Sequence, residues 1–158
     1  MIGRRALLAG LMLGVGAGAS ARAAPQGKSA GGKLETVEIV TMRGRQSFQV
    51  EIAATRAQQE RGLMFRKSLA PDHGMLFTYA KPQRVAYWMK NTLIPLDIIY
   101  IAPNGKILSI ARNARPHDET PLASGGLVLG VLELAGGRAA QLGILPGDRV
   151  MHRIFPKG

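Results

Sequence analysis

Apolar and polar residues alternate in short segments from Glu35 onward, a pattern typical of half-buried β-strands. Two alternating segments, Thr36–Val40 and Phe48–Ile52, lie on either side of Gly44 and predict a hairpin. The turn sequence Pro103-Asn104-Gly105 separates two further apolar segments. Six short apolar segments bounded by Gly, Pro or Asn predict more strands, at 75–79, 85–89, 96–101, 107–111, 128–134 and 150–154. The pattern therefore predicts about eight short strands.

Two short helices are expected between these strands. Thr55 stands three residues before Gln58, the spacing of a capping box, and good helix formers follow until Gly62. Residues 137–142 predict one more helical turn. The whole pattern indicates a mainly β fold: a small β-sandwich or barrel-like domain with one or two short helices.

The N-terminus has the composition of a secretory signal peptide. Residues 1–5 are basic, residues 6–19 are apolar, and Ala21-Arg22-Ala23 offers small residues where a signal peptidase reads them. We expect cleavage after Ala23, followed by a flexible leader at 24–34 and a single domain at 35–158. The apolar run is too short for a membrane-spanning helix, which needs about 20 residues. We therefore expect a periplasmic or secreted protein with no transmembrane anchor after signal cleavage.

Composition narrows the choice of partners. The chain has no cysteine, so it forms no disulfide. It has 21 Lys and Arg against 10 Asp and Glu; residues 1–23 hold three of the arginines and no acid, so 18 basic residues and a net charge of +8 remain. Such an excess favours anionic envelope components as partners. We expect no nucleic acid, because the basic residues are scattered and Trp88 is the only tryptophan.

Several short motifs follow one another along the chain: 61-RGLMFR-66, 74-GMLF-77, 88-WMKNT-92, 95-PLD-97, 131-VLEL-134 with Gly137, and 147-GDRV-150. Together they resemble the motifs of one family, the bacterial and archaeal domain of unknown function 192. The similarity extends from about Thr36 to Ile154 with the motifs in family order. It implies a small, mostly β domain that is often exported, and it implies no activity.

Two carboxylates stand in strongly apolar strands. Asp97 lies on the same predicted strand face as Ile99 and Ile101, and Glu133 is flanked by two leucines. A buried charge is costly unless it is paired or hydrogen-bonded. Either both carboxylates are satisfied inside the fold, by backbone amides or by Arg61, Arg66 or Lys90, or they form a catalytic acid–base pair. The second reading requires both carboxyl groups to face one cleft.

A second group of residues suggests a binding site. Trp88 and Met89 can line an apolar pocket, and Asn91 with Lys90 can orient a polar ligand at its rim. Arg61 and Asp97 are further candidate binding residues. A tryptophan in a short strand is more often part of the core. His73, His117 and His152 lack the spacing of a metal site, and the methionines form no Met-x-x-Met run, so we expect no metal and no other cofactor.

These residues support two hypotheses. We favour a non-catalytic ligand- or partner-binding module of the cell envelope that uses Trp88, Asn91 and Asp97. The alternative is a small hydrolase with a two-carboxylate site, Asp97 and Glu133. The sequence contains no recognisable nucleophile motif, which favours a binding protein over an enzyme.

Overall fold

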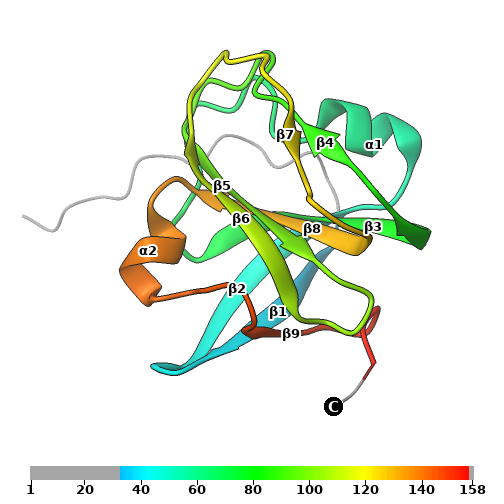
Figure 1. The fold of residues 1–158 in the computed structure, drawn as a ribbon. Helices are drawn as coiled ribbons and strands as arrows, with labels where there is room; N and C mark the ends of the chain where they lie inside the picture. Colours follow the sequence, from blue (N-terminus) through cyan, green and yellow to red (C-terminus); the bar gives the residue numbers. More distant parts are fainter. Residues whose placement is uncertain (1–32, 157–158) are drawn as a thin grey trace, which may run out of the picture.

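The structure, a computed structural model, describes residues 33–156, and these residues form a mainly β domain (Figure 1). The expected fold class is confirmed, and both expected helices are present. The predicted signal peptide and most of the predicted leader lie outside this range. The elements are β1 (Leu34–Thr41), β2 (Gly44–Ala53), α1 (Arg56–Arg61), β3 (His73–Gln83), β4 (Ala86–Tyr87), β5 (Leu96–Ile101), β6 (Ile107–Ala114), β7 (Leu122–Ala123), β8 (Val128–Ala135), α2 (Arg138–Leu142) and β9 (Arg149–Met151).

Seven of the strands form one sheet that curls into a half-barrel, in the order β6-β5-β8-β3-β2-β1-β9. Neighbours are antiparallel except β2 and β3, which run parallel and are connected through α1. The curl brings the start of β6 to β9. There the Val150 N–H donates to the Gly105 carbonyl and the Ile107 N–H donates to the Asp148 carbonyl, each at 2.8 Å, beside a bridge between Lys106 and Arg149. These contacts form a short seam.

Alternating residues of the sheet supply two separate apolar clusters, one on each face. On β8, Leu132 and Leu134 belong to the cluster inside the curl, whereas Val131 belongs to the cluster on the outer face. The outer cluster also contains Phe77 and Tyr100. A small second sheet, the antiparallel pair β4–β7, lies beside it, since Tyr87 of β4 packs edge-on against both of these rings. The outer face is therefore covered, and it is here that a pocket forms.

The element boundaries differ from the sequence expectations in four places. The expected strand at 85–89 is only two residues long, and β9 ends at Met151 rather than at Ile154. β7 was not expected, because two residues are too few to show alternation. β1 begins at Leu34, so the leader expected to reach this residue ends earlier. The helices within residues 33–156 are too short and too polar to cross a membrane.

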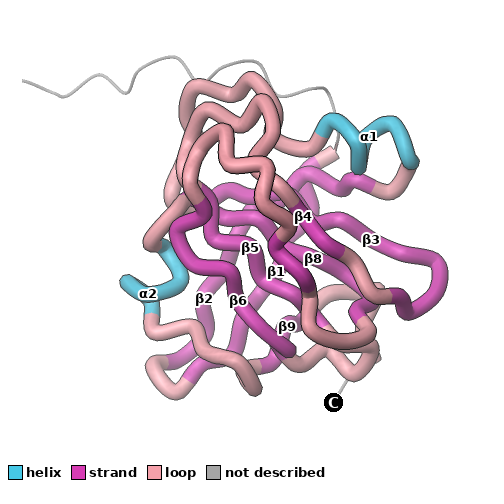
Figure 2. The backbone as a smooth tube through the Cα atoms, turned by 45° about the horizontal axis from the view of Figure 1, so that its top comes forward, coloured by secondary structure: helices cyan, strands magenta, loops and turns pink. Residues whose placement is uncertain are grey.

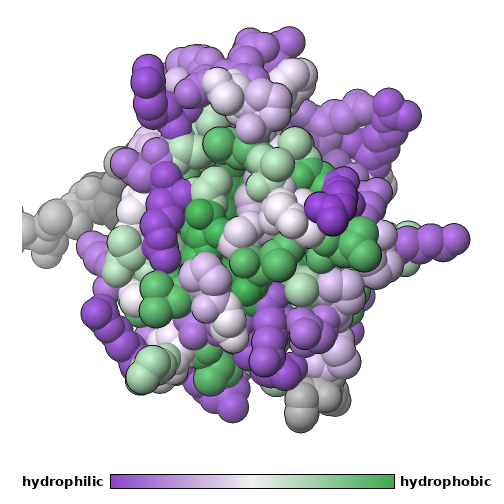
Figure 3. Space-filling view, in the orientation of Figure 1, coloured by the Kyte–Doolittle hydropathy of each residue, from purple (hydrophilic) through white to green (hydrophobic). Residues whose placement is uncertain are grey.

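Polar side chains surround an apolar region on the face shown in Figure 3. Several leucines of the domain are exposed, among them Leu108 and Leu127, which are 38% and 54% exposed. Scattered exposed apolar residues of this kind are normal on a folded domain.

Candidate functional site

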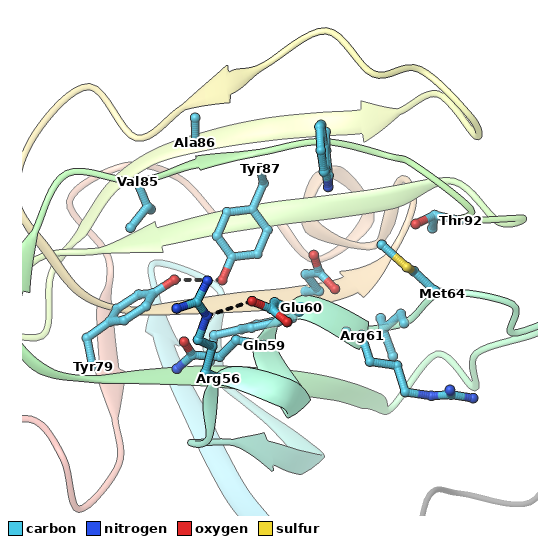
Figure 4. Close-up of a pocket in the computed structure, with 15 residues that line it drawn as sticks. Arg56, Gln59, Glu60, Arg61, Met64, Tyr79, Val85, Ala86, Tyr87 and Thr92 are labelled. Carbon is cyan, nitrogen blue, oxygen red and sulfur yellow. Dashed lines mark hydrogen bonds and ion pairs between the residues drawn. The ribbon is translucent and has the colours of Figure 1, made fainter.

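A pocket of about 440 Å³ opens on the outer face of the sheet, between α1, β3, β4 and β8 (Figure 4). Its size lies within the range of small-molecule sites, roughly 300–1,000 Å³. Phe77, Tyr87 and Leu63 supply much of its apolar lining, and Glu133 of β8 supplies a carboxylate. Arg61 and Trp88 also line it. The pocket thus combines an apolar wall with a few polar groups.

Helix α1 is fixed as one wall by local hydrogen bonds. The Thr55 hydroxyl accepts the Gln58 N–H at 3.3 Å, and the Gln58 side chain accepts the Thr55 N–H at 2.9 Å, which completes the expected capping box. The Gln59 amide nitrogen donates to the Thr78 carbonyl of β3 at 2.9 Å. Gly62 ends the helix with φ of +46°, and an added Cβ would lie 3.2 Å from the Phe77 ring. Glycine adopts a positive φ without strain and has no Cβ to crowd the Phe77 ring, so it is the residue best suited to this position.

Glu133 is the most unusual residue of the pocket. It is 5% exposed, and its carboxyl group accepts no hydrogen bond from residues 33–156. Burial raises the pKa of this carboxyl to about 8, and the Arg66 charge only partly opposes that rise. The Glu133 oxygens are nevertheless open to the pocket, because His152 Nδ1 is the one fully buried side-chain polar atom without a hydrogen-bond partner among residues 33–156. A ligand in the pocket can therefore reach this carboxyl group and supply hydrogen bonds to it.

Glu133 lies in a row of residues that crosses three strands on the outer face. Glu51 of β2 pairs with Met75 of β3, and Met75 pairs with Glu133. The two nitrogens of the Arg66 guanidinium bind the two Glu51 oxygens at 2.6 and 2.7 Å. This bidentate pair is largely buried and satisfies Glu51. The Arg66 charge is therefore engaged by Glu51, which leaves Glu133 without an ion-pair partner of its own.

Three tyrosines lie near Glu133: Tyr79 and Tyr87 line the pocket, and Tyr100 is buried in the outer cluster. The hydroxyls of Tyr79 and Tyr87 share a hydrogen bond at 2.9 Å, and the Tyr100 hydroxyl donates to the Leu122 carbonyl. Burial raises the pKa of all three phenols, and the nearby Glu133 carboxyl adds to the rise. All three therefore stay protonated at neutral pH. The Tyr79–Tyr87 pair has one hydroxyl proton outside their mutual hydrogen bond, which is available to a ligand.

Asp97 lies on the opposite face of the sheet from Glu133. The β5–β8 register pairs Ile98 with Glu133, so the side chain of Asp97 points into the cluster inside the curl. Asp97 is fully buried, and its oxygens accept three backbone N–H groups: Asn113 at 2.7 Å, Gly137 at 3.1 Å and Ala139 at 2.7 Å. It therefore joins β6 and the start of α2 to β5. The prediction of a catalytic pair formed by Asp97 and Glu133 is therefore wrong, because the two carboxyl groups do not face one cleft.

The predicted binding residues separate into two sets. Trp88, which is 50% exposed, and Arg61 both line the pocket. Met89 is 1% exposed and belongs to the outer core cluster, because the chain leaves β4 after Tyr87 and turns the thioether inward. Asn91 is exposed and adopts a φ of +52°, and its carbonyl accepts the Phe65 N–H at 2.9 Å. Asn91 is a turn residue outside the pocket lining.

Tyr79 and Tyr87, which line the pocket, and Glu51, which binds Arg66, were not predicted as site residues from the sequence. A signal for Glu51 existed, since it alternates with Val50 and Ile52 in a predicted strand as Glu133 does in its own. Within residues 33–156, no group of three or more His, Asp or Glu side chains is placed to hold a metal ion.

The geometry defines a class: a small, curled β-domain with a ligand-sized pocket on the outer face of its sheet. The chain belongs to the domain of unknown function 192 family, described as "Uncharacterized ACR", whose model matches residues 38–152. The resemblance noted in the sequence is thereby confirmed. No curated protein matches the chain.

Two solved structures share the fold. A protein of unknown function from Novosphingobium aromaticivorans DSM 12444 is 43% identical, with a TM-score of 0.78 over 88% of this chain and 99% of that chain. A protein from Sinorhizobium meliloti 1021, whose description proposes a role as a transcription regulator, is 42% identical, with a TM-score of 0.75 over 78% of this chain and 97% of that chain.

Proposed function

We propose that this protein is an exported, non-catalytic binding protein of the cell envelope whose pocket takes a small anionic, hydroxyl-bearing ligand such as a glycan fragment. The observation that carries the proposal is Glu133, a buried carboxyl group that lines the pocket and has no hydrogen-bond partner in the described domain. A ligand hydroxyl can bond this group whether it is protonated or ionised, because a hydroxyl both donates and accepts.

The remaining lining supports the ligand class. Arg61 is exposed at the pocket and has no ion pair within the described domain, so its guanidinium is available to a carboxylate or phosphate. Trp88 offers a half-exposed indole against which a ring can stack. The spare hydroxyl proton of the Tyr79–Tyr87 pair adds one donor inside. An anionic, hydroxyl-bearing ring complements these features together.

Export rests on the signal-like residues 1–23, and a net charge of +8 after their removal favours anionic partners. We do not extend a role in transcription to this chain, because the described helices have six and five residues and neither resembles a recognition helix.

The test is a fluorescence titration of residues 24–158 with soluble disaccharides that carry a carboxylate or a phosphate. Trp88 is the sole tryptophan and lines the pocket, so its emission reports occupancy directly. We expect a saturable change for at least one acidic disaccharide. Glu133→Gln and Arg61→Gln each weaken that binding about five- to tenfold, the loss expected for one hydrogen bond of about 1–1.4 kcal/mol.

Lys106→Gln is the matched control for Arg61→Gln. It removes the same charge from an exposed residue at the seam, outside the pocket lining, and leaves binding unchanged. The proposal fails if no acidic disaccharide changes the emission, or if the pocket variants bind as tightly as the control. Cleavage of a bound disaccharide would overturn its non-catalytic part.

A further inference from the structure

Backbone hydrogen bonds join three loop segments into one face beside the pocket. We call it the loop face, and it consists of residues 61–67, 88–93 and 115–120. The Phe65 N–H donates to the Asn91 carbonyl at 2.9 Å, and the Met89 N–H donates to the Asp118 carbonyl at 2.8 Å. The His117 N–H is shared between the carbonyls of Met89 and Thr92, at 3.1 and 3.2 Å. These loops lie at the top of Figure 1, and Figure 2, in which that end is turned toward the viewer, shows them side by side.

Large apolar side chains are exposed on this face. Phe65, Trp88 and Leu93 are 57%, 50% and 40% exposed. Phe65 adopts a φ of +63°, a left-handed conformation that costs a non-glycine residue roughly 1–2 kcal/mol. Its phenyl ring is thus held in solvent by a strained backbone, and such strain gathers at functional sites.

Basic side chains accompany these apolar ones. Arg61, Lys67, Lys90 and Arg115 form no ion pair within residues 33–156, while the acids of the loop face are Asp118 and Glu119. The Lys90 ammonium lies 5.2 Å from the centre of the Trp88 ring. Most of the residues at the top of the view in Figure 3, where these loops lie, are hydrophilic. The loop face therefore carries a net positive charge around its exposed aromatic rings.

We propose that the loop face docks onto an anionic lipid bilayer. Indole rings favour the headgroup level, phenyl and leucyl side chains enter the acyl boundary, and lysines and arginines bind the lipid phosphates. Charge complementarity selects an anionic bilayer as the partner, because the chain keeps a net charge of +8 after removal of the signal-like residues 1–23. Arg61 and Trp88 belong to both the loop face and the pocket lining, so docking turns the pocket toward the lipid surface. This inference does not depend on the ligand proposed above.

The test is co-sedimentation of residues 24–158 with phosphatidylcholine vesicles that contain a quarter phosphatidylglycerol. We expect binding that is lost in pure phosphatidylcholine, together with a blue shift of Trp88 emission. Phe65→Asn weakens binding about tenfold, because it deletes the inserted ring. Asparagine tolerates the left-handed backbone, so the same variant melts no lower than the parent. If Phe65→Asn is at least as stable as the parent but binds vesicles more weakly, the loss of binding comes from the missing ring and not from misfolding.

Two controls test the location of the docking surface. Lys67→Gln with Lys90→Gln weakens binding about fivefold per charge, whereas Lys81→Gln with Lys106→Gln leaves it nearly unchanged. Met42→Ser with Leu145→Ser removes exposed apolar side chains elsewhere and also has no effect. The inference is overturned if anionic vesicles do not bind the protein, or if the control pairs weaken binding as much as the loop-face variants. Because neither Phe65 nor Lys67 lines the pocket, these results are independent of disaccharide binding.

Discussion

Replacement of Asp97 by asparagine isolates the contribution of one buried carboxylate. The carboxylate accepts three backbone N–H groups, two at one oxygen and that of Ala139 at the other. Asparagine keeps the shape but offers a single acceptor oxygen, so its amide nitrogen must face one of the three donors. The substitution therefore removes a hydrogen bond to a charged group, about 1.5–3 kcal/mol, and leaves a buried donor unsatisfied, about 1–3 kcal/mol.

These two costs predict that Asp97→Asn lowers the free energy of unfolding by about 3–5 kcal/mol. That is a large part of the 5–15 kcal/mol typical of a whole domain. Urea denaturation of residues 24–158 measures it, with Glu119→Gln as the control because it removes the same charge from an exposed loop residue. A loss below about 1 kcal/mol for Asp97→Asn would refute the structural role, since one unmade buried bond already exceeds it.

Three further predictions concern the rest of the chain. Because the pKa of Glu133 is raised from 4.5 to about 8, the folded state binds its proton more tightly. The contribution of this group to stability is therefore fully present below pH 4.5 and falls by about 3–5 kcal/mol as the pH rises to 8, and a comparison of urea titrations of Glu133→Gln with the parent isolates that slope. Arg66→Met leaves the buried Glu51 carboxylate without its ion-pair partner and should lower the free energy of unfolding by about 3–5 kcal/mol. The double variant Arg66→Met, Glu51→Leu should recover most of that loss, and no recovery would contradict the ion-pair argument. Expression of the full chain in a bacterium should give an exported product that begins at residue 24, and intact mass spectrometry showing an uncleaved product would contradict cleavage after Ala23.

Much of the fold was predictable because its information is local. Alternation revealed most strands of the main sheet, and the Thr55–Gln58 spacing located α1. The period of two also placed Asp97 on the face of Ile99 and Ile101, where the structure has it. These predictions needed only residues adjacent in sequence.

The site was less predictable because it depends on how distant strands pair. Asp97 and Glu133 are both buried acids in apolar strands, yet only the β5–β8 register shows that they point to opposite faces. The row that joins Glu51 to Glu133 likewise depends on the pairing of β2, β3 and β8. No local pattern encodes which residues of separate strands become neighbours. Met89 was misplaced for a related reason, since the early end of β4 changes which face it takes.

The seam between β9 and the start of β6 also bears on aggregation. An open seven-stranded sheet would offer two edges with unpaired N–H and carbonyl groups to other copies of the chain. Here the curl turns one edge toward the other, and β9 is only three residues long. The bridge at the seam joins Lys106 to Arg149, and two basic side chains at an edge repel a second copy that approaches it. A chain without disulfides thus obtains part of its protection against edge-to-edge association from the closure of its own sheet.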